Sequence, residues 1–135
     1  LTALLSIVPA ILLANCQTSG TASSSPGNPH PDLPANYRQQ IAEFMRTQFP
    51  SGIKGAEVSD PHRAFAGLIL GGDRDWVCVR VGITVFGYVF KDKSLHWDTG
   101  GIVSQLGRGV LAERLVCGEN PNFKPFPEVD YQSRA

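Results

Sequence analysis

The sequence lacks an excess of charge of either sign, because 12 Lys and Arg residues balance 12 Asp and Glu residues among 135. A neutral chain produces no long-range field that would draw it onto nucleic acid or acidic lipid, so nucleic acid is not an expected partner. Walker, GxGxxG and G-x-S-x-G motifs are absent, and no HxH, HxxxH or CxxC spacing brings metal ligands together. We therefore expect a non-catalytic protein with no cofactor, no metal site and no catalytic residue.

Charge is also missing from the first fifteen residues, which include the apolar run LTALLSIVPAILL at positions 1–13. As a helix this run spans about 20 Å, whereas the hydrocarbon core of a bilayer is roughly 30 Å thick. That length is typical of the apolar region of an export signal rather than of a membrane span. An initiator Met and a basic stretch are lacking, so we expect residues 1–15 to be a signal peptide with a truncated start.

The apolar run ends in Leu13-Ala14-Asn15-Cys16, which resembles a bacterial lipobox, although Asn15 departs from the usual small residue. The resemblance implies that Cys16 becomes the lipid-modified first residue of the mature protein and carries two or three fatty chains of the palmitate type. Two or more chains hold a protein almost permanently on a membrane. Gln17 is not the Asp that marks inner-membrane retention in enteric bacteria, so the same resemblance favours the outer membrane, facing the periplasm.

Residues 17–34, QTSGTASSSPGNPHPDLP, are almost free of apolar side chains. Such a segment cannot bury enough surface to offset the entropy lost on ordering. We expect residues 16–34 to form the lipidated cysteine and a flexible tether, with His30 solvated. A globular domain is then expected over residues 35–135.

The expected domain is α+β, with one N-terminal amphipathic helix packed on an antiparallel sheet of four or five strands. Apolar residues recur at helical spacing in PANYRQQIAEFMRTQF, and Pro50, Ser51 and Gly52 end the pattern. Strands are predicted at residues 56–59, 65–70, 76–81, 84–90 and 94–97. FAGLIL and VFGYVF are apolar on both faces, so both are expected at the centre of the sheet. A short helix is predicted at 110–115, followed by a proline-rich strap over residues 120–131.

Only three cysteines are present. If lipid consumes Cys16, Cys78 and Cys117 remain as an even pair, which an oxidising periplasm would join as a disulfide. The alternative is a pair of buried, reduced cysteines.

Few residues suggest a site. His96 and Asp98 share one face of a predicted strand, as a general base and its orienting partner would, but a solvated strand face explains the same spacing. Asp73-Arg74-Asp75 is most simply a charged hairpin tip. Aromatic side chains make efficient protein contacts, and we take Trp97, Phe123 and Phe126 as candidates for binding.

Three segments, YRQQIAEFMRTQFP, DWVCVRV and CGENPNFKPFPEV, resemble a group of small uncharacterised lipoproteins of alphaproteobacteria. The resemblance covers most of the domain and implies an envelope location and an α+β periplasmic domain. We expect a non-catalytic accessory or scaffold protein that binds another envelope protein. The alternatives are an inhibitor of a cell-wall hydrolase, whose characteristic loops this sequence lacks, and a small hydrolase using His96 and Asp98.

Overall fold

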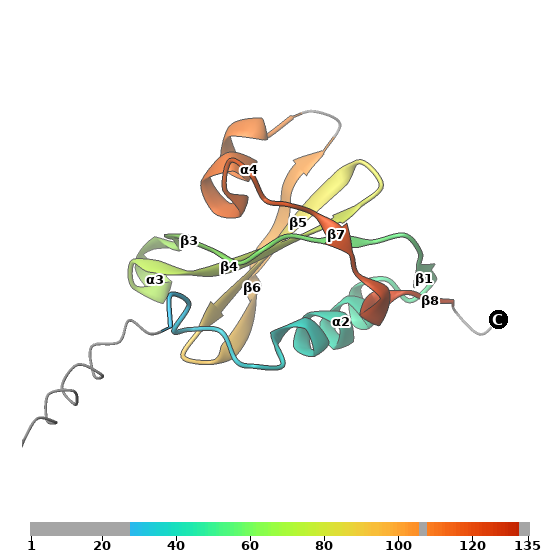
Figure 1. The fold of residues 1–135 in the computed structure, drawn as a ribbon, viewed down its shortest axis with the longest axis horizontal. Coiled ribbons are helices and arrows are strands. Elements are labelled where there is room, and N and C mark those ends of the chain that lie inside the picture. Colours follow the sequence, from blue (N-terminus) through green and yellow to red (C-terminus); the bar gives the residue numbers. More distant parts are fainter. Residues whose placement is uncertain (1–27, 106–107, 133–135) are drawn as a thin grey trace, which may run out of the picture.

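The computed structural model describes residues 28–105 and 108–132, apart from the side chains of residues 97–100 and 132. Helices lie on both faces of an antiparallel sheet (Figure 1), so the predicted α+β class is confirmed. The amphipathic segment forms α2 (Tyr37–Gln48), which buries Ile41, Ala42 and Met45. Phe49 and Pro50 end this helix where the sequence predicts.

The sheet has six strands in the order β6-β5-β4-β2-β7, with β3 also paired to β4, so the predicted four or five strands are too few. The strands are β2 (Glu57–Val58), β3 (His62–Phe65), β4 (Asp73–Val81), β5 (Thr84–Lys91), β6 (Ser94–Gln105) and β7 (Lys124–Pro125). Tight turns join β4, β5 and β6. Asp92 and Lys93 in the second turn both have positive φ, as a two-residue hairpin requires.

Side chains alternate across the long central strands, and each face of the sheet therefore has its own core. On one face α2 packs on Val77, Val79, Tyr88 and Phe90. On the other, α4 (Val110–Cys117) covers a smaller cluster around Cys78 and Val85. The central position predicted for VFGYVF, between a helix and a second layer, is confirmed.

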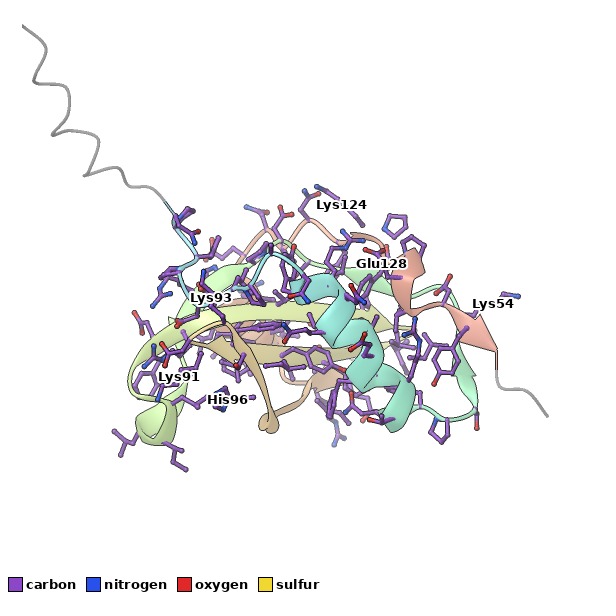
Figure 2. All side chains as sticks on the ribbon, turned by 90° about the horizontal axis from the view of Figure 1, so that it is seen from below. Lys54, Lys91, Lys93, His96, Lys124 and Glu128 are labelled. Carbon is purple, nitrogen blue, oxygen red and sulfur yellow. A yellow bond between two sulfur atoms is a disulfide. The ribbon has the colours of Figure 1, made fainter. Side chains whose placement is uncertain are left out.

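The C-terminal strap crosses the edge of the sheet and returns beside α2. It contains β7, the 3-10 turn η1 (Pro127–Val129) and β8 (Tyr131–Gln132), which pairs with β1 (Gly52–Ile53). Phe126 and Val129 are buried in the main core. Glu128 lies beside α2 (Figure 2) and accepts hydrogen bonds from Arg38 Nε and Nη2 at 2.6 and 2.8 Å.

The strand predicted over residues 65–70 is wrong. Strand β3 stops at Phe65, and Gly67–Leu70 forms α3, a single helical turn at the tip of the β3–β4 hairpin. Gly67, Gly71 and Gly72 all have positive φ, a conformation that strands do not use. Leu68 and Ile69 are therefore 92% and 86% exposed instead of lying at the centre of the sheet.

The packed domain begins earlier than the predicted boundary at residue 35. Asp32 and Leu33 are buried, and the main-chain N–H of Lys93 donates to Asp32 O at 2.9 Å. Residues 28–34, expected as the end of a flexible tether, are part of the fold.

Candidate functional site

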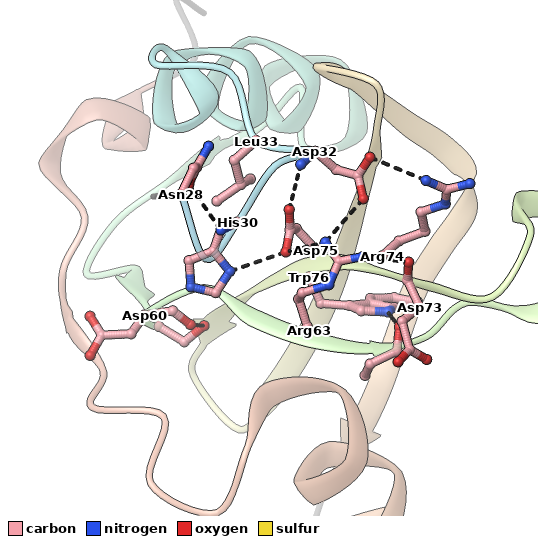
Figure 3. A network of polar contacts seen from close by, with 12 residues as sticks. Asn28, His30, Asp32, Leu33, Asp60, Arg63, Asp73, Arg74, Asp75 and Trp76 are labelled. Carbon is pink, nitrogen blue, oxygen red and sulfur yellow. Dashed lines mark hydrogen bonds and ion pairs between the residues drawn. The ribbon is translucent and has the colours of Figure 1, made fainter. Parts of the chain in front are cut away.

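A buried polar network fixes the start of the described chain against β3 and β4 (Figure 3). At its centre is the carboxylate of Asp75, which is completely buried. The main-chain N–H of Asp32 donates to Asp75 Oδ2 at 2.7 Å. His30 Nδ1 and Arg63 Nη1 each lie 3.1 Å from Asp75 Oδ1.

The second carboxylate of the network, Asp32, accepts hydrogen bonds from three elements. The Asp92 N–H lies 2.9 Å away, and guanidinium groups of Arg63 and Arg74 lie 3.3 Å away. Burial acts to raise the pKa of Asp32, but the Asp92 N–H and the two guanidinium groups outweigh it. They hold the pKa of this carboxyl below its ordinary value.

This arrangement fastens residues 30 and 32 to β3 and β4. Asp75 Oδ1 is shared between His30 Nδ1 and Arg63 Nη1, so both side chains are engaged in holding the segment to the sheet. Within the described part of the chain, every buried side-chain nitrogen and oxygen has a hydrogen-bond partner. No cluster of His, Cys, Asp and Glu among those residues could hold a metal ion.

An open apolar groove of about 410 Å³ lies next to the network, between β3 and α4. We call it the β3–α4 groove; its lining is Arg63, Ala64, Phe65, Ala112, Leu115 and Val116. Phe65 and Leu115, which line its two sides, are 62% and 67% exposed. Soluble proteins rarely leave large contiguous apolar surface open unless it is used for binding.

The predicted disulfide is present: Cys78 in β4 is joined to Cys117 at the end of α4, with 5.7 Å between the Cα atoms. It ties the helical side of the groove to the sheet. Arg63 connects the groove to the polar network, because it lines the first and donates to both carboxylates of the second. Cys16 lies outside the described residues, so its lipidation stays a prediction.

Two of the three aromatic candidates, Phe123 and Phe126, pack within the fold. Phe126 is only 1% exposed, and the Arg38 guanidinium lies 5.1 Å from the centre of its ring, so its side chain is part of the core and is not presented at the surface. Phe123 packs beside the disulfide cluster, and Arg80 lies over its ring at 4.3 Å. Both side chains secure the strap to the sheet. The side chain of Trp97 lies outside the described part.

The prediction that Asp73-Arg74-Asp75 forms a charged hairpin tip needs a correction, because only Asp73 is exposed. Strand alternation places Asp75 on the same face of β4 as the buried Val77 and Val79. This alternation in the sequence indicates that Asp75 is buried. His96 is half-buried in β6 opposite Val89. The Asp98 side chain is not described, so the predicted pair with His96 stays a prediction.

Neither protein-family models nor curated proteins and solved structures give a match to this chain. The resemblance to alphaproteobacterial lipoproteins therefore stays a prediction. Across residues 28–105 and 108–132, no helix has the length and apolar character needed to cross a membrane.

Proposed function

We propose that the protein is an envelope lipoprotein, anchored through Cys16 and facing the periplasm, whose domain binds another envelope protein without catalysing a reaction. The observation that carries the binding role is the β3–α4 groove, an apolar surface left open beside a fully satisfied polar network. Its expected occupant is an apolar segment of the partner, because alanine, valine, leucine and phenylalanine side chains dominate its lining.

The groove has the properties of a preformed site. Its volume is within the range of protein cavities that accept the side chains of a ligand. The disulfide fixes α4 on one side, and the pairing of β3 with β4 fixes the other. A surface that is already ordered loses little conformational entropy on binding.

The anchor accounts for the location. The lipobox-like Leu13-Ala14-Asn15-Cys16 supports attachment at Cys16, and a disulfide is typical of an oxidising compartment such as the periplasm. The twelve residue steps from Cys16 to Asn28 span at most about 40 Å when fully extended. A partner in or on the same membrane would therefore be within reach of the groove.

Site-specific photo-crosslinking in intact cells tests the binding role. A photoreactive residue at Leu115 should give a crosslinked band with one envelope protein, and the same residue at Ile83 should not. Ile83 is the matched control, because its side chain is 62% exposed but lies in the β4–β5 turn, away from the groove. Phe65→Ser should weaken the Leu115 crosslink. Equal crosslinking from both positions, or none from either, contradicts the proposal.

The anchor is tested separately by the intact mass of the protein from cell membranes. The proposal requires the added mass of two or three acyl chains on a chain that begins at Cys16. An unmodified Cys16 thiol overturns this part of the proposal, whatever the crosslinking shows.

A further inference from the structure

Leu68 and Ile69, which we call the α3 tip, are the most exposed large apolar side chains of the described residues. They are adjacent in sequence and project from the end of the β3–β4 hairpin. Exposed single apolar residues are common, but two neighbours that are both almost completely exposed form a protruding apolar contact point.

Hydrogen bonds hold the α3 tip in this position. The Ala66 N–H donates to Gly72 O at 2.9 Å, which closes the loop that carries α3. Arg74 Nε donates to Leu70 O at 2.6 Å and ties the end of the turn to β4. The two apolar side chains are thus presented by a fixed hairpin and do not fold back onto the sheet.

The α3 tip lies at the end of the molecule where the described chain begins. Arg74 donates both to Leu70 O, in α3, and to the carboxylate of Asp32. The start of the described chain and α3 lie at the same end of the molecule (Figures 1 and 2), and Figure 2 shows them on opposite sides of that end. Asp32 is sixteen positions after Cys16 in the sequence. Through Arg74, the α3 tip therefore lies at the same end of the fold as the segment that leads to Cys16.

Charges of both signs surround this end. Asp73 is exposed directly after the α3 loop, Lys91 ends β5, and the exposed Asp92 and Lys93 form the β5–β6 turn. Figure 2 places the two lysines at the end that carries α3 and Lys54 at the opposite end. A rim of mixed charge suits the headgroup layer of a bilayer and gives no net attraction to anionic lipid.

We infer that Leu68 and Ile69 insert into the boundary between headgroups and acyl chains of the bilayer that holds Cys16, and so fix the orientation of the domain on the membrane. This inference rests on the proposed function, because the lipid anchor supplies the high effective concentration at which such a small apolar contact is occupied. The contact depends on apolar burial and not on net charge, so it should not weaken in high salt.

Fluorescence quenching by brominated lipid tests this contact. The lipid-modified protein is purified from membranes and reconstituted into phosphatidylcholine vesicles that contain brominated acyl chains. Ile69→Trp should add fluorescence that these vesicles quench, at low and high salt alike. Ile83→Trp is the matched control, since it lies at the other end of β4, about 25–30 Å away, and its added fluorescence should not be quenched. The protein with only its native Trp76 and Trp97 gives the baseline.

The outcomes separate this inference from the proposed function. Added fluorescence at position 69 that is not quenched, in a protein whose mass shows the acyl chains, overturns the tip contact alone. Quenching that Leu68→Asp leaves unchanged also overturns it. If Ile69→Asp instead dissociates a dimer in solution, the tip binds a second copy and the inference is wrong. Should Cys16 prove unmodified, the proposed anchor fails, and coupling its thiol to a maleimide lipid lets the same quenching decide the tip contact.

Discussion

Asp32 shows how one side chain can connect several parts of this fold. Its carboxylate accepts from the β5–β6 turn through the Asp92 N–H, and from β3 and β4 through Arg63 and Arg74. Its main-chain N–H donates to Asp75. Because the three bonds to the carboxylate favour its ionised form, the charge of Asp32 stabilises the folded state.

Acid should therefore weaken the protein in a way that depends on Asp32. The pKa of this group in the folded state lies below the ordinary value of 3.8, so the folded state binds its proton less readily than the unfolded state does. The stabilisation is complete above pH 3.8 and is lost as the pH falls through the folded-state pKa. Urea unfolding at a series of pH values should show a smaller loss of stability in acid for Asp32→Asn than for the unsubstituted protein.

Part of the acid dependence should remain in that variant, because the hydrogen bond from Arg38 also lowers the pKa of Glu128. Asp92→Asn is the matched control. Asp92 is exposed and contributes its main-chain N–H to the network, and Asn tolerates its positive φ of 51°. If the unfolding free energy of Asp32→Asn falls in acid as much as that of Asp92→Asn, the ionised form of Asp32 does not stabilise the folded state.

The burial of Asp75 could have been read from the sequence, but its partners could not. The alternation Asp75, Val77, Val79 predicts a carboxylate on the core face of β4, and only its position at a presumed hairpin tip argued against this. His30 and Asp32, in contrast, are 45 and 43 residues away in a segment whose composition predicts disorder. Pairings over such distances depend on how the whole fold brings the two segments together.

At the scale of elements, α4 depends strongly on its surroundings. An eight-residue helix has little stability of its own, and Val110, Leu111 and Leu115 are exposed. The small cluster around Cys78, Val85 and Cys117, the disulfide and a hydrogen bond from Ser104 in β6 to Glu113 hold it to the sheet. The shape of the β3–α4 groove therefore depends on the disulfide.

Replacing both disulfide cysteines should weaken the domain substantially. The bond closes a loop between positions 39 apart, which in the chain-entropy account contributes about 4 kcal/mol to the free energy of unfolding. Cys78→Ala combined with Cys117→Ala should lose roughly that amount in urea unfolding under oxidising conditions. Cys16→Ser is the control and should leave the unfolding free energy unchanged. Equal stability of the double variant and the control would show that the disulfide does not hold α4.

Elements with a strong local pattern were predictable, and those that depend on distant pairing were not. The apolar stripe of α2 and the β-branched residues of β4 and β5 predict these elements directly. The prediction for FAGLIL was wrong because its composition is apolar, while Gly67 within it and Gly71 directly after it adopt positive φ. The two-residue strands β1, β7 and β8 carry no local signal, since each exists only through its partner strand.

For the molecule as a whole, the main difference from expectation is where the tether gives way to the domain. Composition favours disorder up to residue 34, yet Leu33 packs in the main core. His30, Asp32 and the carbonyl of Leu33, which accepts from Lys93 Nζ at 3.1 Å, connect this segment to the sheet. If Cys16 carries the proposed anchor, only the twelve residue steps between Cys16 and Asn28 separate it from the described domain, and the proposed contact of the α3 tip would lie correspondingly close to the membrane.

Two shortened chains, one beginning at residue 28 and one at residue 35, test where the folded domain begins. A chain that begins at residue 35 loses the buried Leu33 side chain and the hydrogen bonds that residues 30 and 32 give to the buried carboxylate of Asp75. It should unfold with a free energy about 3 kcal/mol lower than a chain that begins at residue 28. Chemical denaturation of both proteins, with the disulfide intact, measures the difference. Restoring the segment with Leu33→Ala should recover the part of the loss that comes from the hydrogen bonds to Asp75, because the His30 side chain and the Asp32 N–H are present again, but not the part that comes from the buried Leu33 side chain. If the two chains unfold at the same denaturant concentration, the segment belongs to the tether after all, and the α3 tip would have no fixed relation to the anchor.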